Sequence, residues 1–352
     1  MRLLIEQGGA LTTVQDLGRW GRQSLGVSVS GAMDAPSLIR GNLLLGNAPG
    51  AAALEITFLG PSVLFAGSEG CITVSGGDLV PKINGTPVPM WTVLTVKPGD
   101  RLTFGGFHGA GCRAYLCVGG GISVPAFMGS RSTYLRAHAG GWQGRALKSG
   151  DELAAGTPWV LWRRLAGLMC PAELRPDFSD APLRAVPGPQ DSYVAPESLK
   201  AFYSTDYRIS DAADRMGFRL EGGRPVEFLK GPDIVSDGIP LGAVQIQGHG
   251  QPIVMMADRQ TTGGYVKIAV VHALDTARLA QRAPGQTVRF VPITQEQGIE
   301  LSRHEAAALE KLRFCVRHFA ARPQAAAAAP RNGAALLRIN GREYRVSWEK
   351  LD

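Results

Sequence analysis

The sequence has little charge and lacks long apolar runs. Charged residues make up 19% of its 352 residues, and no apolar stretch is long enough to cross a membrane. The segment from Met1 to Gly9 lacks the apolar core of a secretory signal. The net charge of +7 is diffuse, and arginine-rich spots such as Arg163-Arg164 carry no interleaved aromatic residues. We therefore expect a cytoplasmic protein that binds neither membranes nor nucleic acid.

Paired cysteines are also missing. The cysteines are odd in number, form no C-x-x-C pair, and each lies in or beside an apolar run; they are Cys71, Cys112, Cys117, Cys170 and Cys315. Disulfide frameworks and cysteine-based zinc sites have characteristic paired spacings. Buried free thiols in a reducing compartment explain these residues better, and we expect no metal site.

Glycine and proline, in contrast, are abundant. The 45 glycines and 23 prolines favour many turns and short strands over long helices. Short strands follow one another from Leu54 to Phe104, separated by turn sequences such as Gly60-Pro61 and Asn84-Gly85. The length suits two domains or one large β unit. The prediction is a mainly β fold with few helices.

A polar, proline-rich segment from Cys170 to Ala185 is the best candidate for a domain boundary. We expect an N-terminal β domain over residues 1–180 and a C-terminal β domain over residues 181–320. Residues 321–352 should form an alanine-rich tether, Gln324 to Pro330, and a hairpin about Asn340-Gly341.

The second half of the chain weakly echoes the first. Three landmarks recur in the same order: Val27 to Asp34 with Ile209 to Met216, Leu54-Glu55 with Val226-Glu227, and Pro98-Gly99-Asp100 with Pro284-Gly285-Gln286. This order suggests two related β units. A site between them would be natural, because pockets favour domain interfaces.

Three helices are predicted. One covers Ser37 to Leu45, where Asp34 can cap the first turn. A short one covers Pro196 to Tyr203, and an amphipathic one covers Thr294 to Phe319. Asp34 has two interpretations: a helix cap, or a carboxylate beside a pocket.

The stretch from Asp237 to Val271 concentrates polar chemistry. Alternation predicts strands at Gly242 to Gln247 and Tyr265 to Val271, with an apolar strand at Pro252 to Ala257 and a loop from Asp258 to Gly264. One face then carries an amide, a phenol and an amine beside a loop with further polar groups: Gln245, Tyr265, Lys267, Gln260 and Thr261. Either solvent or a small polar molecule can face these residues.

A second polar stretch, Gly129 to Arg136, combines hydroxyl groups and guanidinium groups with glycine. Its candidate ligand-binding residues are Arg131, Ser132, Tyr134 and Arg136. These groups can hold a carboxylate or a phosphate, or they can form a solvent loop whose arginines pair with acidic neighbours. The stretch does not match the Walker pattern for nucleotide binding.

Several motifs together resemble one family. They are T-V-Q-D-L-G-R (Thr13 to Arg19), V-S-G-A-M-D (Val29 to Asp34), G-S-R-S-T-Y-L-R-A (Gly129 to Ala137), P-G-P-Q (Pro187 to Gln190), D-R-M-G-F-R-L (Asp214 to Leu220) and Q-T-T-G-G-Y-V-K (Gln260 to Lys267). The chain resembles the biotin-dependent carboxyltransferase family, which includes allophanate hydrolase subunit 2, the corresponding urea carboxylase segment and the C component of 5-oxoprolinase. The resemblance extends to about Pro292 and implies tandem cyclophilin-like β-barrel domains.

The resemblance also implies partners and a reaction. A free-standing chain of this length is most similar to the oxoprolinase component, a hydrolase that opens the cyclic amide 5-oxoproline to glutamate with ATP. Its partners would be a subunit 1-type carboxyltransferase chain, similar to the B component of 5-oxoprolinase, and a lactam-binding chain similar to the A component. In such a site Lys267 would stabilise negative charge, Gln245 would donate from its amide, and Asp34 would orient water or the amine.

Two other functions remain open. One is carboxyl transfer from carboxybiotin to an amide or acid, and only this one requires biotin. The chain contains no Met-Lys-Met-type biotin attachment site. The other is a non-catalytic regulator, because one branch of the family binds a kinase inhibitor.

Overall fold

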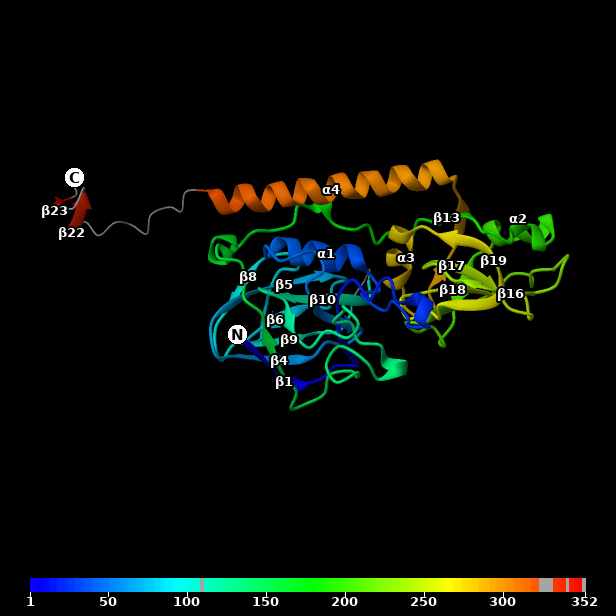
Figure 1. Ribbon diagram of the computed structural model, residues 1–352, viewed down its shortest axis with the longest axis horizontal. Coiled ribbons are helices and arrows are strands. Elements are labelled where there is room, and N and C mark those ends of the chain that lie inside the picture. Colours follow the sequence, from blue (N-terminus) through cyan, green and yellow to red (C-terminus); the bar gives the residue numbers. More distant parts are fainter. Residues whose placement is uncertain (108–110, 323–331, 340–341, 350–352) are drawn as a thin grey trace.

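Figure 1 shows the computed structural model, which describes residues 1–107, 111–322, 332–339 and 342–349. The first half of the chain forms two antiparallel sheets. One has seven strands in the order β11-β12-β1-β4-β9-β6-β7: β1 Arg2–Gln7, β4 Ser62–Ala66, β6 Pro81–Ile83, β7 Thr86–Pro87, β9 Arg101–Phe104, β11 Ile122–Ser123 and β12 Glu152–Ala155. The other has the order β2-β3-β10-β5-β8: β2 Leu11–Gln15, β3 Ala53–Thr57, β5 Gly70–Gly76, β8 Leu94–Val96 and β10 Arg113–Val118.

Side chains from both sheets form one apolar core. Leu3 and Phe65 come from the first sheet, and Val74 and Leu116 come from the second. All four are completely buried. Burial of each such side chain contributes roughly 1.5–3 kcal/mol, so this shared core holds the two sheets together.

The second half forms one nine-stranded sheet with the order β20-β14-β15-β18-β17-β19-β13-β21, and β16 pairs with β19 beside this path. Its strands are β13 Leu183–Pro187, β14 Tyr207–Ile209, β15 Gly217–Glu221, β16 Asp233–Gly238, β17 Ala243–Ile246, β18 Pro252–Met255, β19 Thr262–Val271, β20 Thr287–Val288 and β21 Phe290–Pro292. The terminal strands of the path, β20 and β21, are separated in sequence by Arg289 alone. The sheet therefore curls into a nearly closed barrel, which removes most of its free edge.

The described residues contain four α-helices: α1 Ala35–Leu44, α2 Pro196–Ser204, α3 Ala273–Ala280 and α4 Gln295–Ala321. The same residues include five short 3-10 helices: η1 Gln23–Leu25, η2 Leu135–Ala137, η3 Trp162–Leu165, η4 Ala172–Leu174 and η5 Asp191–Tyr193. The long helix α4 returns from the second half and packs along α1 (Figure 1). Arg40 of α1 forms an ion pair with Glu305 of α4 at 2.6 Å, and Leu312 is buried in the same apolar cluster as Leu38 of α1. Across the described residues, no helix combines the length and the apolar character that crossing a bilayer requires.

Buried polar contacts join the two halves. Arg215, which precedes β15, bonds to Glu55 of β3 and to Asp258, whose carboxylate oxygens lie 3.0 and 3.1 Å away. Gln281 at the end of α3 donates to Asp34 at 2.6 Å and accepts from the backbone N–H of Arg113 at 2.9 Å. Because such groups are costly to bury unpaired, the two halves have one preferred relative arrangement.

The prediction of a mainly β fold with few helices is confirmed. The capping role of Asp34 is observed, and the helix that follows it covers Ala35–Leu44. The predicted amphipathic helix is α4, which begins with a capping box between Thr294 and Gln297. The predicted loop to Gly264 was wrong at its end, because Thr262–Val271 is one continuous strand.

The predicted repeat is visible at one landmark. Gly99 and Gly285 both have positive φ angles, 94° and 87°, in turns that precede β9 and β20. At another landmark, Glu55 lies in β3 whereas Glu227 lies outside a strand. The turns at the first landmark are therefore alike, whereas the strand at the second landmark has no counterpart.

The cysteines are free thiols, and four of the five are buried. Burial raises the pKa of Cys71 and of Cys117 to about 12, so both remain neutral thiols. Cys315 is partly exposed, which differs from the prediction that all five are buried.

The segment after α4 contains one strand pair. β22 Asn332–Ile339 and β23 Arg342–Glu349 are antiparallel, with Asn332 opposite Glu349 and Ile339 opposite Arg342. The predicted turn at Asn340-Gly341 and the alanine-rich tether lie outside the described residues.

Candidate functional site

A cavity of about 60 Å³ opens on the barrel of the second half. Three predicted site residues line it, Gln245, Gln260 and Tyr265. Its other lining residues come from β15, β17, β18 and the segments that adjoin these strands: Asp214, Met216, Gly217, Arg219, Gln247, Ile253 and Met255. One water needs roughly 10–15 Å³, so the cavity suits the edge of a small molecule rather than a nucleotide.

Two glutamine amides at this cavity have buried atoms without a hydrogen-bond partner. Gln245 on β17 is 3% exposed, and its Nε2 has no acceptor. Gln260, in the loop before β19, has no donor for its Oε1. An unpaired buried polar atom costs about 1–3 kcal/mol, so this pair is unfavourable unless water or a ligand satisfies it.

Gly263 lies close to both amides. A Cβ atom at this position would lie 3.1 Å from Nε2 of Gln245 and 3.5 Å from Nε2 of Gln260. It would also lie 2.7 Å from Cδ1 of Ile239, so the Ile239 side chain would have to move to admit it. The glycine in the Q-T-T-G-G motif therefore lets Ile239 and the two amides pack closely around this position.

Lys267 lies beside Gln245, because the two residues are paired across β19 and β17. Its side chain is only 1% exposed, and Nζ lies 3.2 Å from Oδ2 of Asp237 on β16. The contact is close enough for an ion pair, but the ammonium has no well-aligned hydrogen-bond acceptor. The N–H of Gly238 and the ammonium of Lys267 lower the pKa of Asp237, which keeps this carboxylate charged.

Gln190 fixes the backbone at Lys267. Its side-chain oxygen accepts from the N–H of Lys267 at 3.1 Å, and its own N–H donates to the carbonyl of Lys267 at 3.2 Å. Gln190 ends the P-G-P-Q segment, which begins at the last residue of β13. This double contact holds the strand in the position that directs Lys267 toward Asp237.

The loop around Arg131 is organised by a carboxylate of the protein itself. Asp16 accepts from the hydroxyls of Ser130 and Ser132 and, at 2.6 Å, from the backbone N–H of Arg131. The guanidinium of Arg131 is exposed, and its Nε donates to the carbonyl of Val124 at 2.9 Å. The serine hydroxyls are thus used internally, whereas the remaining nitrogens of Arg131 are free for solvent or an anion.

Arg136 connects this loop to the cavity. Its guanidinium lies 3.8 Å from Asp214, which lines the cavity, and both side chains are about half exposed. Tyr134 is partly buried and pairs with Ala139 through backbone hydrogen bonds. The loop of the first half and the barrel of the second half therefore meet at the cavity rim.

Two predicted site residues, Asp34 and Thr261, lie away from the cavity. Asp34 is completely buried, and its carboxylate accepts from Ser37 and Gln281. Burial raises its pKa, while these hydrogen bonds lower it. Thr261 contacts the turn before β17 through its carbonyl, which accepts from the N–H of Ile239 at 3.0 Å. Neither residue lines the cavity.

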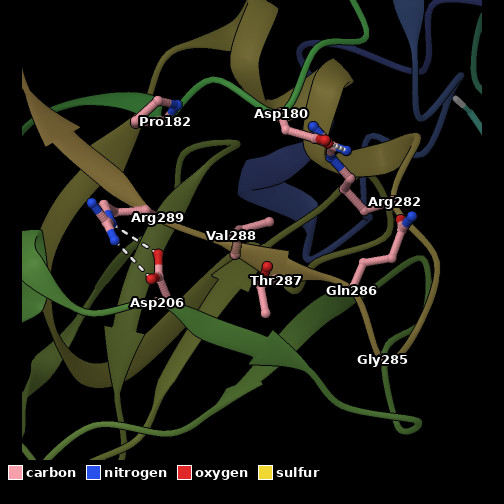
Figure 2. Close-up of a pocket in the computed structure, with 9 residues that line it drawn as sticks. All are labelled: Asp180, Pro182, Asp206, Arg282, Gly285, Gln286, Thr287, Val288 and Arg289. Atoms are coloured by element: carbon pink, nitrogen blue, oxygen red, sulfur yellow. Dashed lines mark hydrogen bonds and ion pairs between the residues drawn. The ribbon is translucent and has the colours of Figure 1, made fainter.

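A different cavity, of about 540 Å³, lies between the linker and the end of the barrel, and none of the predicted site residues lines it (Figure 2). Its two arginines already have carboxylate partners, Arg289 with Asp206 at 2.7 Å and Arg282 with Asp180 (Figure 2). The smaller cavity is the better candidate, because its polar atoms lack partners. In the part of the chain that the structure describes, no group of three or more His, Cys, Asp or Glu side chains is arranged to hold a metal ion.

Residues 25–292 match the family model of the carboxyltransferase domain, subdomains A and B. The chain belongs to this family. It is 36% identical to the 5-oxoprolinase C component of Escherichia coli over 88% of this chain and 97% of that protein. It is also 36% identical to urea amidolyase of Lachancea kluyveri, over 86% of this chain and 18% of that protein.

Solved structures agree with this relationship. The crystal structure of the K. lactis urea amidolyase superimposes with a TM-score of 0.82 at 30% identity, covering 88% of this chain and 20% of that one. The relatives are enzymes or enzyme subunits by name. The predicted family is therefore confirmed.

Sequence reasoning assigned no role to several residues that shape this site. Asp237 stood at the start of the polar stretch, and Gln190, Asp214 and Asp16 stood within the quoted motifs. The polar type of each was a signal. Their partners are 30 or more residues away in sequence or in the other half of the chain, so the pairing itself was not visible.

Proposed function

We propose that this chain is the C component of an ATP-dependent 5-oxoprolinase, which converts 5-oxoproline to glutamate. One observation carries the proposal: the chain corresponds to 97% of the Escherichia coli 5-oxoprolinase C component, but to only 18% of the urea amidolyase. The likeness thus extends over nearly the whole of the 5-oxoprolinase component and over a minor part of the urea amidolyase.

Opening the lactam ring of 5-oxoproline requires a cation and hydrogen-bond donors in the active site. A lactam carbonyl is a poor electrophile, and phosphorylation of its oxygen creates a leaving group that water can displace. In our proposal Lys267 stabilises the negative charge that develops, and Gln245 donates to the substrate from the neighbouring strand. Burial supports this role for Lys267, because an ammonium acts more strongly where water is excluded.

The remaining predicted residues surround this centre. Gln260 and Tyr265 line the cavity, with Thr261 next in the same loop. Arg131 and Arg136 provide positive charge for a carboxylate or phosphate at the rim, beside Ser132 and Tyr134. Asp34 acts from a distance, as a helix cap and as the acceptor for Gln281 that joins the two halves.

The cavity is too small for a nucleotide, so we assign ATP to a surface supplied at least partly by a partner chain. The proposed partners are a subunit 1-type chain similar to the B component of 5-oxoprolinase and a lactam-binding chain similar to the A component. The test is co-expression of the three chains, followed by size exclusion and by measurement of 5-oxoproline-dependent ATP hydrolysis. A chain that stays separate at micromolar concentration, or a mixture whose activity does not depend on this chain, would contradict the proposal.

Carboxyl transfer from carboxybiotin is the second candidate, favoured by the family's carboxyltransferase domain and by the urea amidolyase superposition. In that reaction Lys267 would stabilise the enolised biotin urea. Avidin separates the two functions, because it sequesters biotin. Inhibition of the reconstituted activity by avidin would favour carboxyl transfer, and unchanged lactam-dependent ATP hydrolysis would favour the oxoprolinase.

A further inference from the structure

The unpartnered atoms of Gln245 and Gln260 are complementary in type. Nε2 of Gln245 is a donor without an acceptor, and Oε1 of Gln260 is an acceptor without a donor. Both residues line the same cavity, and Gly263, which has no side chain, lies close to both amides. The two amides do not bond to each other. A single bound group that offers one acceptor and one donor would satisfy both.

The geometry of amides restricts what that group is. In an ordinary trans amide the C=O and N–H point in opposite directions, so one edge presents only one of them. A small ring forces the amide to be cis, and its C=O and N–H then lie side by side on one edge. Five-membered lactams and cyclic ureas are such groups.

We propose that Gln245 and Gln260 together recognise the cis-amide edge of a cyclic amide. The carbonyl of the ring accepts from Nε2 of Gln245, and its N–H donates to Oε1 of Gln260. The inference rests on the proposed function and specifies the substrate class of that same site. It makes the two glutamines specificity-determining residues that distinguish a lactam from its ester and ketone analogues.

The neighbouring charge agrees with this placement. Lys267 is paired with Gln245 across the strands and lies next to the cavity, although it does not line it and its ammonium is 3.2 Å from Asp237. Arg219 and Asp214 also line the cavity, and Asp214 is linked to Arg136. A ring that carries a carboxylate, as 5-oxoproline does, would meet positive charge at the rim while its amide edge occupies the interior.

The test uses the full chain alone, with three small probes and no ATP. Saturation-transfer NMR titrations would compare 2-pyrrolidone, which has the cis-amide edge, with N-methyl-2-pyrrolidone and γ-butyrolactone, which lack the N–H. We expect 2-pyrrolidone to bind at least about tenfold more tightly than the other two, because each of them leaves Oε1 of Gln260 unpaired. Equal binding of the lactam and the lactone, or no saturable binding of 2-pyrrolidone, would overturn the inference.

Substitutions of single glutamines provide a second test of the same inference. Gln245→Met should weaken 2-pyrrolidone binding about tenfold or more without lowering the melting temperature, because it removes an unpaired buried donor. Gln295→Met is the control: Gln295 is an exposed glutamine at the start of α4 and does not line the cavity, so binding should stay within about twofold. Wild-type affinity in Gln245→Met would overturn the inference.

The experiments distinguish a failure of the proposed 5-oxoprolinase function from a failure of the proposed recognition of cyclic amides. If the complex does not hydrolyse ATP with 5-oxoproline while 2-pyrrolidone binding still depends on Gln245, the proposed function is wrong and the recognition of cyclic amides stands. If the complex is active and Gln245→Met turns over 5-oxoproline normally, the recognition is wrong and the function stands.

Discussion

The ammonium of Lys267 lies 3.2 Å from the carboxylate of Asp237, and the two side chains differ sharply in exposure, at 1% and 56%. Lys267 belongs to the barrel strand β19, whereas Asp237 belongs to β16, which pairs with β19 in an irregular register beside the main sheet. A buried cation thus depends on a carboxylate from a peripheral strand. Removal of either charge leaves the other without its counter-charge, so a double-mutant cycle can measure the interaction between the two residues.

The first prediction concerns this pair. Asp237→Asn should lower the melting temperature, because it leaves the buried ammonium of Lys267 without its counter-charge. The double variant with Lys267→Met should return close to the wild-type melting temperature, since both charges are then absent. Thermal unfolding of the four proteins in the cycle measures this coupling. Melting temperature changes that simply add would show that the two residues do not interact.

The second prediction concerns the rim. Arg131→Lys should raise the KM for 5-oxoproline in the complex at least several-fold and leave the melting temperature unchanged, because lysine cannot reproduce paired guanidinium donors. Arg208→Lys is a suitable control, since Arg208 is an exposed arginine on β14, paired with Glu221. An unchanged KM in Arg131→Lys would mean that this arginine serves only to bind the carbonyl of Val124.

The third prediction concerns the junction of the two halves. Arg215→Met should destabilise the protein by about 3–5 kcal/mol, because it leaves the buried carboxylates of Glu55 and Asp258 without a cation. Arg208→Met breaks an exposed pair and should cost no more than about 1 kcal/mol. Denaturant unfolding gives both values. Similar small losses in the two variants would show that the buried network is unimportant for stability.

The fourth prediction concerns pH. Hydrogen bonds from Arg145 lower the pKa of Asp151 from 3.8 to about 2 in the folded protein. The bound carboxylate therefore stabilises the fold above pH 3.8, and this stabilisation is lost as the pH falls toward 2. Asp151→Asn should flatten the fall in melting temperature between pH 4 and 2, whereas Asp211→Asn, at an exposed position, should not. Identical pH profiles for wild type and Asp151→Asn would disprove the assignment.

Local patterns predicted the elements of this site well. Alternation placed Gln245 and Lys267 on one face, and the structure pairs them across adjacent strands. Capping residues predicted the starts of α1 and α4 at Asp34 and Thr294. These features depend on neighbours within a few residues, which a single sequence displays directly.

Contacts between distant residues were not predictable in the same way. The partner of Asp34 is Gln281, 247 residues later, and the partners of Asp16 come from the loop more than 110 residues away. Such contacts depend on how the sheets close, and the closure of the barrel at Arg289 has no local signature. The family motifs pointed to the right segments because they contain both members of several contacts.

The central claim, that Lys267 acts on a bound lactam, is tested most directly by 5-oxoproline-dependent ATP hydrolysis in the reconstituted complex with Lys267→Met. Because the side chain is buried and methionine has a similar size, the fold should keep or increase its melting temperature. Turnover should fall on the order of a hundredfold or more, as on loss of one preorganised donor. Lys97→Met, at an exposed turn, should change neither. Turnover at the wild-type rate in Lys267→Met would contradict the account.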